Sequence, residues 1–283
     1  MRLKQLFINQ YQRIILFWLG SFLLVVFFQL VLPLELIALN IDYFLAVVIA
    51  SVAIERLRTK NSYFSFGFFA DRFAAKNALT GLLISIFAIS IFFILKIILA
   101  DSLVSTGLGS KKIIEIIIFQ LTISVSEEIY FRGHLFQALR EKFSDSTAII
   151  SIAVLFTILH STNPNINLHA ITNIFLAGIL LGLMVNITGT LWASVSFHFG
   201  WNILLTLFLD SQLSGFQTYG IYHFEMKDSI LNNILFGGSF GIEESWLTTI
   251  ILLVLIIPAV KYLRFSPYFE AFRFRRQLEE ARD

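Results

Sequence analysis

Long apolar runs follow one another along the whole chain and are separated by short polar segments. The runs cover about residues 14–32, 36–54, 78–99, 113–139, 147–160, 170–185, 191–209 and 246–262. A helix of roughly 20 apolar residues crosses the hydrocarbon core of a bilayer, because each residue adds about 1.5 Å to its length. The pattern therefore predicts an all-α fold, a polytopic membrane helix bundle of about eight transmembrane helices.

The polar segments between the runs predict connections rather than further domains. We expect residues 101–112 to form a loop and the glycine-rich residues 210–245 to form a long connection. The second run is interrupted by Asn40 and Asp42, but it is predicted as one span. The chain has no internal repeat and no change of composition that marks a boundary. It is therefore predicted to be a single integral membrane domain over residues 1–283.

The composition excludes several classes of protein. The chain is 57% hydrophobic and only 14% charged, with a mean hydropathy of +0.79, which is far too apolar for a soluble domain of 283 residues. It has no cysteine, so disulfides, thiolate nucleophiles and cysteine-ligated metals are excluded. The net charge is only +2, and the basic residues form no patch interleaved with aromatic residues, so nucleic-acid binding has no support.

The distribution of lysine and arginine predicts the orientation. With eight spans, sixteen of the 21 basic residues fall on one side of the membrane, whereas only Lys111, Lys112 and Lys227 fall on the other. Cytoplasmic segments carry the excess of positive charge, so both termini are predicted to be cytoplasmic. The arginine-rich residues 265–283 are then a basic cytoplasmic tail, which we expect to be a helix that lies on the membrane surface or in solvent.

Charged residues inside the fourth run are the first sign of chemistry. Glu127, Glu128 and Arg132 lie in an otherwise apolar stretch, where one charged side chain costs about 2.5–3.5 kcal/mol or more. Glu128 and Arg132 are four residues apart and can pair on one helix face, which predicts a supporting ion pair. Glu127 lies about 100° around the helix and is left without that partner.

Two later runs carry further polar groups. His160 lies near the end of the fifth run, and the seventh run contains His198 and Asn202, one helical turn apart. If these groups only joined helices, each contact would contribute about 0.6–2 kcal/mol, which accounts for polarity but not for this choice of groups. Peptide hydrolysis needs a base that activates water and donors that hold the oxyanion. Glu127 with His160 can do the first, and His198 with Asn202 can do the second.

The three motifs EExxxR, FxxxH and HxxxN, in this order and each inside an apolar run, resemble the CPBP (Abi) family of intramembrane proteases. That family includes the type II CAAX prenyl endopeptidases. The resemblance covers a motif core of roughly residues 111–246 and includes Gly178 and Gly182, a small-xxx-small pair that favours close helix packing. It implies an endopeptidase that cleaves a membrane-associated substrate, either a membrane peptide or a lipidated protein, within the lipid bilayer.

The sequence leaves the mechanism and the class of function open. Glu127, His160 and His198 are also a known type of catalytic zinc set, although the helical HExxH spacing is absent. We favour the glutamate mechanism and keep zinc as the alternative cofactor. A non-enzymatic protein on the same scaffold, of bacteriocin-immunity type or associated with a transporter, is the second class of function. Nothing in the chain distinguishes a prenylated substrate from another membrane peptide.

Three further polar groups have ordinary explanations. His169 and Asn173 repeat the HxxxN spacing, but they open the sixth run, where capping of the helix end is expected. Glu243 and Glu244 precede the last run, where the helix dipole favours carboxylates. His134 follows Glu127 by about two turns, and either the same cavity or the membrane interface explains it.

Overall fold

The computed structural model describes residues 10–58, 67–68, 73–140, 142–227 and 229–263. These residues are mostly helical. The long helices are α1 (Gln10–Val31), α3 (Ile41–Arg58), α4 (Ala74–Leu99), α5 (Ser110–Glu128), α7 (Asp145–His160), α8 (Leu168–Thr188), α9 (Trp192–Leu209) and α11 (Trp246–Leu263). The shorter elements are α2 (Leu34–Ala38), the π-helical η1 (Ile129–Leu135), α6 (Phe136–Arg140), α10 (Ile230–Phe236) and the 3₁₀ turn η2 (Ile242–Glu244). The predicted tail, residues 265–283, lies outside the described residues.

The predicted spans coincide with helices. Among the described residues, four helical stretches are long and apolar enough to cross a membrane, namely Ile14–Val31, Ala74–Leu99, Leu168–Thr188 and Trp192–Leu209. Shorter apolar helices cover Ile41–Ile54, Asp145–His160 and Trp246–Tyr262. The all-α membrane bundle is confirmed, whereas the number of eight crossings stays a prediction.

The second predicted span is wrong at its start. Residues 36–54 do not form one helix, because α2 ends at Ala38 and α3 begins at Ile41. Asn40 lies between them with a φ of 61°, a left-handed conformation that asparagine tolerates better than most residues. Asp42, buried in the first turn of α3, accepts a hydrogen bond from Gln29 of α1 at 3.2 Å, so its charge does not interrupt a span.

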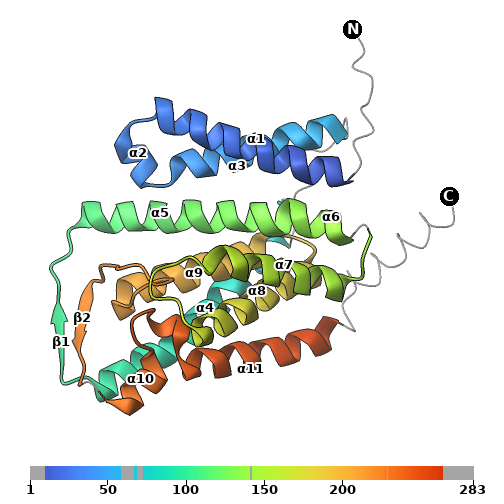
Figure 1. Cartoon of the computed structure of the whole chain (residues 1–283). Helices are drawn as coiled ribbons and strands as arrows, with labels where there is room; N and C mark the ends of the chain where they lie inside the picture. Colours follow the sequence, from blue (N-terminus) through green and yellow to red (C-terminus); the bar gives the residue numbers. More distant parts are fainter. Residues whose placement is uncertain (1–9, 59–66, 69–72, 141, 228, 264–283) are drawn as a thin grey trace, which may run out of the picture.

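The two polar connections contain regular structure that the sequence analysis did not predict. Strand β1 (Ser102–Ser105) pairs with β2 (Tyr222–Glu225) in an antiparallel sheet, with Ser102 opposite Glu225. Helix α10 and the turn η2 lie in the second connection. Figure 1 shows the two strands side by side at the end of the bundle where α5 begins. Residues 101–112 and 210–245 therefore meet instead of forming separate loops.

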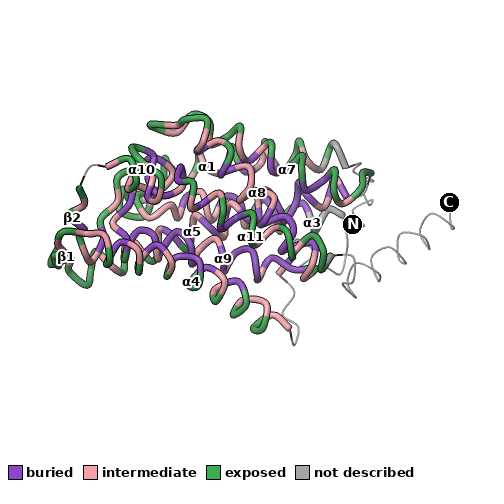
Figure 2. Tube along the Cα trace, turned by 90° about the horizontal axis from the view of Figure 1, so that it is seen from below, coloured by how far each residue is buried: buried purple, intermediate pink, exposed green. Residues whose placement is uncertain are grey.

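Helix α5 lies between two groups of helices. Figure 1 shows the α1 and α3 pair on one side of α5 and the helices α4, α8, α9 and α11 on the other. Buried positions run through the middle of the bundle, and exposed positions lie at its margins (Figure 2). Many large apolar side chains on the outer faces are exposed, including Ile15, Phe22 and Phe87. Such a surface is stable against lipid and not against water.

Glycines allow two pairs of helices to approach closely. A Cβ atom at Gly178 would lie 3.0 Å from Cα of Ala153, and one at Gly182 would lie 3.2 Å from the side chain of Ile149, so α8 packs directly on α7. A Cβ atom at Gly81 would lie only 2.1 Å from the carbonyl oxygen of Ala193, which requires glycine where α4 crosses α9. The predicted packing face at Gly178 and Gly182 is confirmed.

Candidate active site

The glutamate motif lies where the helix geometry changes. Helix α5 ends at Glu128 and continues into the π-helical η1, whose wider turn is a common feature of functional sites. Just before this point the hydroxyl of Ser126 donates to the carbonyl of Thr122 at 2.6 Å. The sequence predicted an uninterrupted helix here, because a π turn has no simple sequence signal.

The predicted pair of Glu128 and Arg132 is confirmed. Arg132 Nη1 lies 2.9 Å from Glu128 Oε1, and both side chains are fully buried. Arg132 Nη2 also donates to the carbonyl oxygen of Gly178 at 3.4 Å, and its guanidinium lies 4.7 Å from the ring centroid of Phe156. The arginine thus joins η1 to α7 and α8 at the centre of the bundle.

His198 lies between the two glutamates, a relationship that the sequence analysis missed. Its Nδ1 lies 3.1 Å from Oε1 of Glu128, and its Nε2 lies 3.8 Å from Oε2 of Glu127. Because Glu128 accepts a hydrogen bond from Nδ1–H, it fixes the orientation of the ring, as carboxylates do for histidines in many catalytic sites. Glu128 therefore has a second contact beyond its pairing with Arg132.

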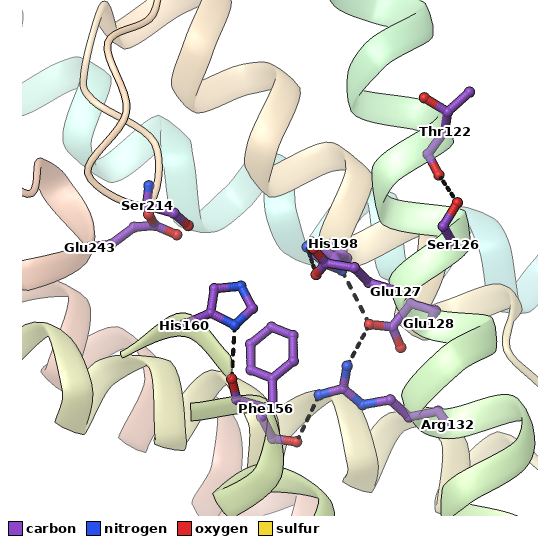
Figure 3. Close-up of polar contacts among 11 residues, drawn as sticks. Thr122, Ser126, Glu127, Glu128, Arg132, Phe156, His160, His198, Ser214 and Glu243 are labelled. Atoms are coloured by element: carbon purple, nitrogen blue, oxygen red, sulfur yellow. Dashed lines mark hydrogen bonds and ion pairs between the residues drawn. The ribbon is translucent and has the colours of Figure 1, made fainter. Parts of the chain in front are cut away.

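His160 lies on the other side of the site. Its Nδ1 lies 2.8 Å from the carbonyl oxygen of Phe156, and its ring lies 4.2 Å from the Phe156 ring centroid. In Figure 3 the imidazole points into the space between His198 and Glu243. No hydrogen bond joins it to Glu127 in the described structure, so the predicted Glu127 and His160 pair is not in direct contact.

One cavity brings the four predicted site residues together. It has a volume of about 1060 Å³, and its lining includes Glu127, His160, His198 and Asn202. The side chain of Asn202 is nearly buried and has no hydrogen-bond partner within the described part of the chain. Its amide is therefore available to a ligand in the cavity.

The cavity reaches the surface at one end of the bundle. Its outer lining includes Glu35, Lys111, Lys112 and the exposed rings of Phe216 and Tyr219. Glu35 lies in α2, the two lysines lie at the start of α5, and the two rings lie in the connection after α9. These elements meet at the end of the bundle where β1 and β2 pair (Figure 1). The cavity thus leads from polar groups at its inner end to a mouth with charged and aromatic side chains.

The roles predicted from the sequence for His134 and for the pair His169 and Asn173 are wrong. His134 does not line the cavity, because it is buried and stacks on Phe17 with ring centroids 4.4 Å apart. Helix α8 is capped by Asn167, whose Oδ1 accepts from the backbone N–H of Ala170, and not by His169 or Asn173. Instead, Asn173 is buried and donates to the carbonyl oxygen of Glu243 at 2.8 Å.

Glu243 is the cavity residue that the sequence analysis missed. It was assigned to the start of the last helix, but its side chain lines the same cavity as His160 and His198. Its Oε2 accepts a hydrogen bond from the backbone N–H of Ser214. The neighbouring Glu244 does not bind the start of α11 either, because it accepts hydrogen bonds from Asn167, Gly238 and Phe240. One feature of the sequence could have indicated the position of Glu243. Two adjacent carboxylates at one helix start cannot both face the same partners, so one of them must point elsewhere.

The described side chains do not fit a three-ligand zinc site in this arrangement. Zinc ligands lie about 2.0–2.3 Å from the ion, so their donor atoms must converge on one point. No group of three or more histidine, aspartate or glutamate side chains among the described residues converges in this way. Nδ1 of His198 is engaged by Glu128 and Nδ1 of His160 by the carbonyl of Phe156, so only Nε2 of each ring could bind a metal. Zinc nonetheless stays an alternative that an experiment below tests.

Comparison with protein families supports the resemblance seen in the motifs. Residues 109–204 match the model of a family described as type II CAAX prenyl endopeptidase Rce1-like. The resemblance to the CPBP family is confirmed. The Rce1-like segment contains all six predicted site residues, and it supports a membrane enzyme of the protease type. A comparison with curated proteins gives no significant match. Glu243 lies outside the Rce1-like segment.

Proposed function

We propose that this protein is an intramembrane endopeptidase in which Glu127 activates water. The observation that carries this proposal is the convergence of Glu127, His160, His198 and Asn202 on one cavity. The family match independently favours a membrane endopeptidase. Hydrolysis of a peptide bond inside a membrane requires water to be held near a base and away from lipid, and a cavity with polar groups at its inner end meets that requirement.

In the proposed reaction, Glu127 removes a proton from a water molecule in the cavity. The resulting hydroxide attacks the carbonyl carbon of the scissile bond, and the carbonyl oxygen becomes an oxyanion. Asn202 donates its amide N–H to that oxygen. His198, as an imidazolium with both ring nitrogens protonated, donates Nε2–H to the same oxygen and Nδ1–H to Glu128. The C–N bond then breaks and the amine leaves with a proton. His160 holds the water on the side of the cavity opposite His198.

The size and lining of the cavity support a peptide with apolar side chains or an attached lipid. At about 1060 Å³ the cavity is at the upper end of the range for small-ligand sites. Apolar side chains such as Ile116, Phe119 and Leu181 also line it. We therefore propose a membrane-associated substrate whose apolar part lies against these residues.

The test uses purified protein in lipid vesicles and a quenched fluorescent peptide with a farnesylated cysteine followed by three residues. We expect wild-type protein to cleave this peptide and Glu127→Gln to lose activity by about 10²-fold or more, because the amide cannot act as a base. Glu225→Gln is the matched control. Glu225 lies in β2, outside the lining of the cavity, and accepts a hydrogen bond from the hydroxyl of Ser102 at 2.7 Å.

A non-enzymatic role predicts a different result. If neither the lipidated peptide nor its unmodified counterpart is cleaved by folded wild-type protein, the proposed function is contradicted. Equal activity of Glu127→Gln and wild type would also contradict it.

A further inference from the structure

A second carboxylate faces the proposed reaction site from a separate part of the chain. Glu243 lies in η2, between α10 and α11, and its side chain lines the cavity that also contains His160 and His198. Figure 3 shows its carboxylate on the side of His160 that is remote from Glu127. The site therefore has one carboxylate on each side of the space where a substrate would bind.

The backbone around Glu243 is fixed by contacts from three elements. Asn173 of α8 donates to the carbonyl oxygens of Glu243 and Ser245, at 2.8 and 3.0 Å. Thr249 of α11 donates in turn to Asn173 Oδ1 at 2.7 Å. The hydroxyl of Ser211 accepts from the backbone N–H of Ile242 at 3.0 Å. These bonds place η2 against the cavity wall.

A glycine and a neighbouring glutamate complete this arrangement. Gly241 has a φ of 97°, and a Cβ atom there would lie 2.3 Å from the carbonyl oxygen of Gln212, so the turn requires glycine. Glu244 accepts hydrogen bonds from Asn167 and from the backbone of Gly238 and Phe240. Glu244 therefore has the structural role, which leaves the Glu243 carboxylate for the cavity.

Hydrolysis of an amide needs a proton donor as well as a base. The amide nitrogen is a very poor leaving group unless it is protonated as the C–N bond breaks. Glu127 is the base in the proposed function, and His198 and Asn202 donate to the oxyanion. His198 and Asn202 are occupied by the oxyanion, and Glu127, which takes its proton from the attacking water, lies on the other side of the site from Glu243.

We propose that Glu243 is the proton donor to the leaving amine. This inference rests on the proposed function. In the step, neutral Glu243 transfers its proton to the nitrogen of the scissile bond as the C–N bond breaks, and becomes a carboxylate. Glu127 has meanwhile gained one proton from water. Proton exchange with solvent through the open cavity then restores both residues, so one water is consumed and an acid and an amine are formed.

The surroundings of Glu243 favour the protonated form that this role needs. Burial raises the pKa of Glu243 above its ordinary value, although the Ser214 N–H and the nearby His160 and His198 act in the opposite direction. The other titratable groups that face this part of the cavity are Glu127 of α5, His160 of α7 and His198 of α9. The neighbouring Glu244 points to Asn167 and not into the cavity.

Two substrates that differ in their leaving group test the proposal. The first is the farnesylated peptide described above. The second carries the same farnesylated acyl part as a phenyl ester, whose phenolate leaves without prior protonation because the pKa of phenol is only about 10. For Glu243→Gln we expect the peptide rate to fall by about 10²- to 10⁴-fold and the ester rate to fall by less than about 10-fold. The ratio of the two rates does not depend on how much of the variant is folded.

Matched variants separate this proposal from the proposed function. Glu127→Gln should lose both activities together, because both reactions need activated water, and Glu225→Gln should lose neither. Glu243→Asp should recover part of the peptide rate, because it restores an acid. If Glu243→Gln loses activity equally on both substrates, or on neither, the proposed role of Glu243 is overturned and the proposed function is not. Glu127→Gln with wild-type activity would overturn the proposed function, as would a wild-type protein inactive on both substrates.

Discussion

The Nδ1 atom of His198 lies 3.1 Å from Oε1 of Glu128. The same carboxylate oxygen lies 2.9 Å from Arg132, so one atom joins a buried cation to the imidazole that faces Glu127. The ion pair that holds the helices together therefore also orients a residue of the proposed active site. Changes at Arg132 should affect both the stability and the geometry of the site.

We expect Arg132→Ala to destabilise the folded protein by about 3–5 kcal/mol, because it leaves the buried carboxylate of Glu128 without its main partner. The variant should melt at a lower temperature in detergent. The control is Lys112→Ala, which removes the more exposed pair with Glu115 and should change stability by no more than about 1 kcal/mol. Equal melting temperatures for Arg132→Ala and wild type would contradict this role.

The contact of α4 with α9 should not tolerate a side chain at Gly81. We expect Gly81→Ala to cost about 1–3 kcal/mol, because its Cβ would clash with the backbone of Ala193 and the helices would have to separate. Gly20→Ala in α1 is the matched control, since no atom lies within 4 Å of its Cβ position. Thermal melts of both variants measure the difference. A Gly81→Ala variant as stable as Gly20→Ala would contradict the close packing.

Much of the fold and part of the site could be predicted from the sequence. Apolar length alone located the helices, and four-residue spacing located the Glu128 and Arg132 pair, because both depend on local periodicity. The break at Asn40 was missed because a single left-handed residue is compatible with the surrounding apolar pattern. Glu243 was misassigned because its position depends on Asn173, which is 70 residues away in the chain. Tertiary contacts of this kind leave no local pattern.

The orientation of the chain can be measured directly because the protein has no cysteine. Lys111→Cys lies at the mouth of the cavity, and Ser144→Cys lies between α6 and α7 at the opposite end of α5. We expect a membrane-impermeant maleimide to label Lys111→Cys on intact cells and Ser144→Cys only after permeabilisation, because the positive charge predicts that Ser144 is cytoplasmic. This result would mean that both termini are cytoplasmic and that the mouth of the cavity faces the other side of the membrane. Labelling of Ser144→Cys on intact cells, with Lys111→Cys labelled only after permeabilisation, would contradict both conclusions.

The pH dependence of stability should reveal the raised pKa of Glu243. Because burial raises its pKa, the folded protein holds this proton at pH values where the unfolded chain has lost it. This proton stabilises the folded state at a pH below 4.5, the ordinary pKa of glutamate. The stabilisation is lost as the pH rises through the pKa of Glu243 in the folded state. Glu243→Gln does not titrate at this position. Its melting temperature relative to wild type should therefore rise between pH 4 and pH 8, and a constant difference would contradict a raised pKa of Glu243 in the folded protein.

The central claim is that Glu127 acts as a base on water and not as a metal ligand. The most direct measurement compares cleavage of the farnesylated peptide by wild-type protein and Glu127→Gln, each after extensive dialysis against a chelator, with metal content determined on the same samples. We predict that dialysed wild-type protein still cleaves the peptide, and that folded Glu127→Gln does not, at equal and negligible metal content. Wild-type activity that is lost on chelation and restored by one equivalent of zinc, with reduced zinc binding in Glu127→Gln, would contradict the glutamate mechanism and support a site formed by Glu127, His160 and His198.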